Sequence, residues 1–220
     1  MTKRKHTKTY LFTVEGETEK WYFERLQHLI NNDLNSSYTV SLKVAIQKNP
    51  LKYVKGLRNI YKTVIYHFCD YESNEQCHVD QFKKTIDMLK EAKKLGKQID
   101  YKLCYSNFTF DLWILLHKYD AKSSIIHRRN YLELLNRAYD KRFENMDSYK
   151  SEENFKRILS RLNLSDVIEA VKRAKFIMQE NKNRGYTLHQ YKGYKFYKEN
   201  PSLMVWEAIE KILKDCNLYT

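Results

Sequence analysis

The sequence predicts an α/β domain with a parallel sheet and helices on both faces, followed by an all-α C-terminal extension. Over residues 8–120, short apolar and β-branched segments alternate with segments whose apolar residues recur at helical spacing. Over residues 121–220 only the helical spacing continues. Strands that alternate with helices are typical of βαβ crossovers, which build a parallel sheet covered on both sides. The 220 residues include only five glycines and two prolines, so we expect long helices and short connections.

The first part contains four strand patterns, each followed by a helix pattern. Its opening strand (YLFTV) is continuously apolar and β-branched, as in strands buried on both faces, and Gly16 ends it. Pro50 marks the start of the second helix, because proline is tolerated in a first turn, and Gly96 closes the third. The predicted strands are residues 10–14, 38–46, 64–70 and 99–106, and the predicted helices begin after Gly16, near Pro50, at residue 80 and at residue 110.

The second part is predicted to be helical and to pack on the first. Its periodic segments are residues 130–145, 151–161, 164–181 and 201–216. The segment between the last two, residues 181–202, is rich in tyrosine and lysine and lacks a clear period. We expect it to form a basic loop.

Charge and aromatic content favour a polyanionic partner. Forty Lys and Arg against 27 Asp and Glu give a formal charge of +13 and a pI of about 9.4, which suits nucleic acid. Eighteen tyrosines accompany these cations and suit stacking on unpaired bases, although many of them are expected in the core. The sequence therefore predicts contact with DNA or RNA.

Apolar run lengths and cysteine spacing exclude other classes of protein. No run of about 18 uncharged apolar residues occurs, and the leader lacks a signal-peptide core, so we expect a cytoplasmic protein without a membrane partner. The four cysteines show no C-x-x-C spacing, which disfavours a zinc ribbon. Cys77 and His78 form at most half of a metal site.

Acidic residues follow the first and third predicted strands. Glu15 and Glu17 lie in VEGE, and Asp70 and Glu72 lie in CDYES. Because the carboxyl ends of parallel strands meet at one edge of a sheet, these carboxylates are expected to converge. Oxygen ligands of this kind suit Mg²⁺ or Mn²⁺, which stabilise the attacking and leaving oxygens in phosphodiester hydrolysis.

Another interpretation of these acids remains open. Acids in a first helical turn often cap the helix or favour its dipole, and this is the preferred interpretation for Glu17, Glu19 and Glu75. It is weaker for Glu15 and Asp70, which end two hydrophobic strands of one sheet.

The segment SNFTFD predicts a second phosphate site. Ser106 or Asn107 would cap a helix whose free amides bind phosphate, and Asp111 would either ligate a metal or only favour the helix N-terminus. His117 is expected to be a core residue rather than a proton-transfer group. Trp113, Leu115 and Leu116 are likewise expected in the core. The cationic candidates for phosphate contact are Lys20, Lys48, Arg128, Arg129, Lys192 and Lys195, although most charged runs are only solvated surface.

Two motifs resemble the Toprim domain. VEGETEKWYFERL is similar to its opening glutamate–glycine motif, and FCDYES is similar to its acid-x-acid motif. Together with YSNFTFDLWILLH and NPSLMVWEAIEKIL, they make the chain resemble the RloB-like family of restriction-linked and abortive-infection proteins. These blocks span most of the sequence.

The resemblance implies a Toprim-like, Rossmann-like fold over residues 8–120 and a Mg²⁺-dependent nuclease of anti-phage defence. Glu15 would be the family's glutamate, and Asp70 and Glu72 its acid pair, with Glu72 where Toprim domains commonly carry Asp. The substrate would be DNA or RNA, with tRNA included. The resemblance also implies a partner ATPase encoded nearby, whereas this sequence itself shows no P-loop, and a homodimer is left open. The alternative is a non-catalytic nucleic-acid-binding or partner-binding module on the same scaffold.

Overall fold

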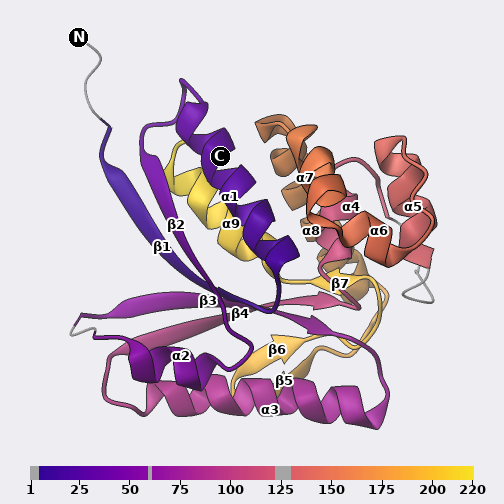
Figure 1. Cartoon of the computed structure of the whole chain (residues 1–220). Coiled ribbons are helices and arrows are strands. Elements are labelled where there is room, and N and C mark those ends of the chain that lie inside the picture. The colour runs from indigo at the N-terminus through magenta and orange to yellow at the C-terminus, as the bar shows by residue number, and fades with distance from the viewer. Residues whose placement is uncertain (1–4, 59–60, 122–129) are drawn as a thin grey trace.

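The computed structural model, which describes residues 5–58, 61–121 and 130–220, is a mixed α/β fold around a curled five-stranded sheet (Figure 1). The strand order is β2-β1-β3-β4-β7. The first four strands run parallel, and β7 pairs antiparallel with the end of β4. The parallel α/β architecture predicted from the sequence is confirmed.

The first part follows the predicted alternation of strand and helix. Its elements are β1 (Thr7–Val14), α1 (Glu17–Asn32), β2 (Thr39–Ile46), α2 (Pro50–Gly56), β3 (Thr63–Tyr71), α3 (Gln76–Lys93), β4 (Ile99–Asn107) and α4 (Asp111–Leu116). Phe12, Thr13 and Val14 are fully buried, as expected of a strand covered on both faces. Helix α3 begins four residues earlier than predicted, and Asn49 caps α2 by accepting from the Lys52 amide.

The second part corrects the all-α prediction, because it also contributes strands. Its elements are α5 (Asn130–Tyr139), α6 (Met146–Lys150), α7 (Glu152–Ser160), α8 (Leu164–Asn183), β5 (His189–Tyr191), β6 (Tyr194–Phe196), β7 (Ser202–Leu203) and α9 (Val205–Asp215). The predicted loop at 181–202 contains the β5–β6 hairpin, whose two turn residues, Lys192 and Gly193, both have positive φ as a type I′ turn requires. The predicted helix at 130–145 is interrupted at Asp140, which also has positive φ.

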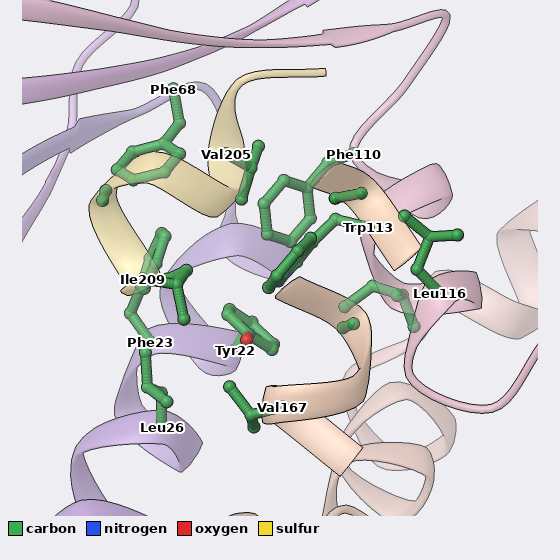
Figure 2. Packing of buried hydrophobic residues seen from close by; sticks show 14 of the residues in the cluster. Tyr22, Phe23, Leu26, Phe68, Phe110, Trp113, Leu116, Val167, Val205 and Ile209 are labelled. Atoms are coloured by element: carbon green, nitrogen blue, oxygen red, sulfur yellow. The ribbon is translucent and has the colours of Figure 1, made fainter. Parts of the chain in front are cut away.

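Different elements cover the two faces of the sheet. Helices α1 and α9, with α4 to α8 beside them, pack on one face, and α2, α3 and the β5–β6 hairpin pack on the other (Figure 1). Figure 2 shows part of the first of these cores, to which Phe23 of α1 and Phe68 of β3 both contribute. The ring centroids of Phe23 and Phe68 lie 4.6 Å apart, and Phe12 packs on both at 4.7 and 5.2 Å. Residues from both predicted parts share this core.

The core predictions for the helix after β4 are confirmed. Trp113, Leu115 and Leu116 are fully buried, and Trp113 packs against Tyr22 of α1 (Figure 2). Within the described ranges, none of the helices has the length and apolar character that crossing a membrane requires.

Candidate functional site

Glu15 and Asp70 meet at the carboxyl ends of β1 and β3. The two strands pair in parallel up to Thr13 and His67, and β3 continues to Tyr71 alongside β4, so Glu15 just after β1 and Asp70 near the end of β3 lie at the same edge of the sheet. The Asp70 backbone amide donates a hydrogen bond to Glu15 Oε2 at 3.2 Å, across 55 residues of sequence. The predicted convergence of these two acids is confirmed.

The environment of Glu15 disfavours its charge. Burial raises the pKa of its carboxyl most, and the negative charges of Glu19 and Glu72 raise it further. The amide of Asp70 and the charge of Lys48 act in the opposite direction without reversing the rise in pKa. Glu15 therefore lies within the electrostatic reach of two other acids, and a bound cation would relieve their repulsion.

Glu19 is the site residue that the sequence interpretation missed. It was assigned to the helix dipole, yet it is only 8% exposed, and burial is the main cause of its raised pKa. A Cβ at Gly16 would lie 3.2 Å from Glu19 Oε2, so this glycine leaves room for the carboxylate. The signal was present in the spacing, because Glu19 precedes Tyr22, Phe23, Leu26 and Ile30 on the apolar face of α1.

Asp111 forms a second layer behind Glu19. It is the first residue of α4, it is 1% exposed, and its Oδ2 lies 2.9 Å from both Lys150 Nζ and Thr109 Oγ1, which donates to it. The charge of Asp111 raises the pKa of Glu19, and the charge of Lys150 lowers it. Asp111 is thus joined to the acid cluster through Glu19.

Glu72 and Glu17 occupy the rim. Glu72 Oε2 lies 3.5 Å from His78 Nε2, and both side chains are about one-third exposed. Glu17 is exposed in the first turn of α1 and pairs with Lys20 at 3.3 Å, in keeping with the helix-dipole interpretation.

The predicted cationic residues separate in space. Lys48 is exposed and lies close enough to Glu15 to lower its pKa. Lys192 pairs with Asp87 at 2.6 Å, and Lys195 belongs to the hairpin whose Tyr194 bonds to Tyr101, near the start of β4. The hairpin lysines therefore lie toward the opposite edge of the sheet, and predicted Arg128 and Arg129 lie outside the described residues.

The helix-cap prediction for Ser106 and Asn107 is wrong. Both are buried within β4 and pair with Leu203 and Ser202 of β7. The Asn107 amide donates to the carbonyl oxygens of Lys198 and Glu199 at 2.9 and 3.1 Å. Strand β4 continues through these residues because β7 pairs with its end, so neither residue presents a helix N-terminus to a phosphate.

His117 is a core residue, as expected. Its Nδ1 bonds to the Trp113 carbonyl oxygen at 2.8 Å, and its Nε2 lies 3.2 Å from the Tyr22 hydroxyl. Burial lowers the pKa of His117 to about 4, which favours a neutral ring that accepts from Tyr22.

The acids together offer an oxygen-only donor set. Glu15, Asp70 and Glu72 line one edge of the sheet, and the charge of buried Glu19 acts on Glu15. Carboxylate oxygens are the ligands that Mg²⁺ and Mn²⁺ prefer, and a divalent cation would offset the repulsion by Glu19 and Glu72 that adds to burial in raising the pKa of Glu15. The residues present therefore fit a hard divalent cation.

Comparison with known proteins gives one match. The model of the RloB-like protein family matches residues 10–212, which include most of β1, most of α9 and every element described between them. No curated protein and no solved structure matches the chain. Because the match covers nearly the whole sequence and includes the acid cluster, the chain belongs to the RloB-like family.

Proposed function

We propose that this chain is a Toprim-type nuclease that depends on Mg²⁺ or Mn²⁺ and cleaves phosphodiester bonds of DNA or RNA in anti-phage defence. The observation that carries the proposal is the contact between Glu15 and the Asp70 amide at the carboxyl ends of two parallel strands, with Glu19 and Glu72 close enough to act on the acids there. The basic composition supports a nucleic-acid substrate, and tRNA is one candidate.

The residues have distinct roles in this proposal. Glu15, Asp70 and Glu72 would hold the cation, which when bound neutralises phosphate charge and activates water. The Asp70 amide donates to Glu15 and so orients its carboxylate. Lys48 would draw the phosphate toward the acids.

The buried second layer keeps the acid cluster in place. Asp111 contacts Lys150 and Thr109, and its charge acts on Glu19. Thus residues from α4 and α6 support an acid of α1, as outer partners support metal ligands in other sites. Asp111 is therefore proposed as a positioning residue.

A cleavage assay with matched variants tests the function. Purified protein is incubated with labelled single-stranded DNA, duplex DNA and total tRNA in Mg²⁺, Mn²⁺ or EDTA. Glu15→Gln and Asp70→Asn are expected to abolish metal-dependent cutting. Glu17→Gln, the same change two residues away at an exposed ion pair, should retain it.

The same assay can reject the proposal. Cutting that persists in EDTA, or that survives in Glu15→Gln, would contradict it. Salt-sensitive binding of equal strength in wild type and Glu15→Gln, without cutting under any of these conditions, would instead support the non-catalytic binding module. A partner ATPase, if the activity requires one, would be identified by co-purification and added to the same assay.

A further inference from the structure

A second group of metal-ligating side chains lies at the start of α3. Glu75 directly precedes this helix, and Cys77 and His78 lie in its first turn. Within the described ranges, one ligand atom from each of these three residues lies within 4.8 Å of the other two. Glu75 and Cys77 are exposed and His78 is partly exposed, so an ion can reach them from solvent.

The donor set differs in kind from that of the acid cluster. A thiolate and an imidazole are ligands for Zn²⁺ and similar ions, whereas Mg²⁺ takes oxygen. The carboxylate of Glu75 completes a Cys–His–Glu set. The kinds of ligand atom therefore distinguish this group from the oxygen-only cluster of Glu15 and Asp70.

The spacing suits a tetrahedral ion. Zinc with bonds of about 2.3 Å to sulfur and about 2.1 Å to oxygen places these two ligands about 3.6 Å apart, and Cys77 Sγ lies 4.0 Å from Glu75 Oε2. Two ligands such as imidazole nitrogen and carboxylate oxygen are separated by about 3.4 Å, and His78 Nε2 lies 3.5 Å from Glu72 Oε2. A small rotation of the exposed side chains would bring Cys77 and Glu75 to this spacing, whereas Glu72 contacts His78 but lies outside the group of three and would have to turn toward it.

Ser73 supplies the supporting contact that zinc-binding histidines usually have. Its Oγ lies 2.7 Å from His78 Nδ1, which fixes the orientation of the ring and leaves Nε2 directed at Glu72. Ser73 Oγ also accepts from the Glu75 amide at 3.1 Å, so one hydroxyl organises both the imidazole and the backbone of Glu75.

We propose that Glu75, Cys77 and His78 bind a thiophilic divalent cation, of which Zn²⁺ is the best match, with Glu72 in the fourth position. Glu72 would then be shared between two ions of different chemistry. A consequence, which rests on the proposed function, is that zinc withdraws Glu72 from the Mg²⁺ cluster and suppresses cleavage.

Cysteine alkylation measures zinc binding without reference to activity. Cys69, Cys104 and Cys216 are buried and Cys77 is exposed, so iodoacetamide should modify Cys77 alone in the folded protein. Stoichiometric ZnCl₂ is expected to slow this modification at least tenfold, with full reversal by EDTA. Mass spectrometry of the tryptic peptide gives the rate at Cys77.

Matched variants assign the ligands. His78→Ala and Glu75→Gln should each lose most of the protection, whereas His28→Ala and Glu91→Gln, the same substitutions at other sites on helix surfaces, should keep it. Equal alkylation rates with and without zinc, or full protection in His78→Ala, would overturn the proposed site. Circular dichroism of each variant establishes that folding is retained.

Different results would reject the zinc site and the nuclease function. Glu15→Gln should retain zinc protection of Cys77 while losing cleavage, so protection without any nuclease activity would leave the zinc site standing. In the active protein, equimolar zinc should reduce Mg²⁺-dependent cleavage at least tenfold in wild type and less than twofold in His78→Ala. Equal inhibition of both would reject the sharing of Glu72 even if zinc protects Cys77.

Discussion

Acids on the helix surfaces and acids at the strand ends have opposite electrostatic surroundings in this fold. On α7, Glu152 pairs with Lys156 at 2.6 Å and Glu153 pairs with Arg157, each one helical turn away. These side chains are largely exposed, and such pairs are typical of solvated helices. In a chain with an excess of 13 positive charges, an exposed acid readily has a cation beside it.

At the strand ends the acids gather with one another instead. Burial and the charges of Glu19 and Glu72 raise the pKa of Glu15, and burial raises the pKa of Glu19. Burying like charges together costs free energy, so stability alone does not explain the arrangement. This contrast is what makes the cluster the candidate site, because groups with perturbed pKa values often gather at functional sites.

The largest expected effect comes from removing a buried acid. Glu19→Gln keeps the shape of the side chain but removes its charge, and it should lower metal-dependent cleavage on the order of 100-fold, as outer partners of metal sites do. The apparent Mg²⁺ affinity should fall with it, which a purely structural role would not produce. Cleavage rates over a Mg²⁺ titration provide the measurement.

Glu153→Gln is the matched control on the helix surface. It removes an acid whose partner, Arg157, stays solvated, so rate and Mg²⁺ dependence should match wild type. A similar loss of activity in both variants would show that the distinction between the two classes of acid is wrong.

The next largest effect is expected at Lys150, whose ammonium group pairs with Asp111. Lys150→Met leaves the carboxylate of Asp111, which is 2% exposed, without its ion pair. We expect a loss of about 2–4 kcal/mol in the free energy of unfolding, because Lys150 is itself partly exposed and the pair is not fully desolvated. Urea denaturation followed by circular dichroism provides the value.

Lys156→Met serves as the surface counterpart, since its pair with Glu152 is exposed on both sides. Its denaturation midpoint should be indistinguishable from that of wild type. If Lys150→Met also leaves the denaturation midpoint unchanged, other groups compensate the buried charge of Asp111. The proposed role of the Asp111–Lys150 pair in supporting Glu19 would then be wrong.

The burial of Glu15 and Glu19 determines the direction in which stability changes with pH. The raised pKa values of Glu15 and Glu19 mean that the folded chain keeps protons that the unfolded chain has already lost. Stability linked to these groups therefore falls as pH rises from the ordinary glutamate value through the raised value. The Glu15→Gln/Glu19→Gln double variant lacks both groups, so its stability should rise relative to that of wild type as the pH increases from 4.5 to 8.

Urea titrations of both proteins across this range measure the difference, in which the other titrating groups cancel. Saturating Mg²⁺ at pH 8 should stabilise wild type and leave the double variant unchanged. Parallel pH curves for the two proteins would mean that both acids are as well solvated as surface glutamates.

The parts of the fold that local patterns encode were predictable from the sequence. The second half of β1 and the middle of β3 are largely apolar and buried, and the acids at their carboxyl ends could be placed together because parallel strands end at one edge. The core position of Trp113 likewise followed from its apolar helical surroundings.

The errors arose where distant contacts decide the local structure. Ser106 and Asn107 stay in β4 because β7, only two residues long, pairs with them from nearly 100 residues away. A strand of two residues is too short to show an alternating pattern in the sequence. Glu19 was missed for another reason, since an acid in a first helical turn already had an adequate explanation in the helix dipole. Its place on the apolar face of α1 was the better evidence.

The smallest expected effect tests whether a cation near the acids acts on substrate or only on Glu15. Lys48 is exposed and its charge reaches Glu15, so Lys48→Ala should weaken nucleic-acid binding about three- to tenfold and reduce the slope of log affinity against log salt by about one. Lys43→Ala, at an exposed position farther back on β2, should alter neither value as much. Fluorescence anisotropy at several salt concentrations distinguishes the two variants. An unchanged salt slope in Lys48→Ala, together with a lower cleavage rate, would assign Lys48 to the electrostatics of Glu15 and leave phosphate binding to other cations.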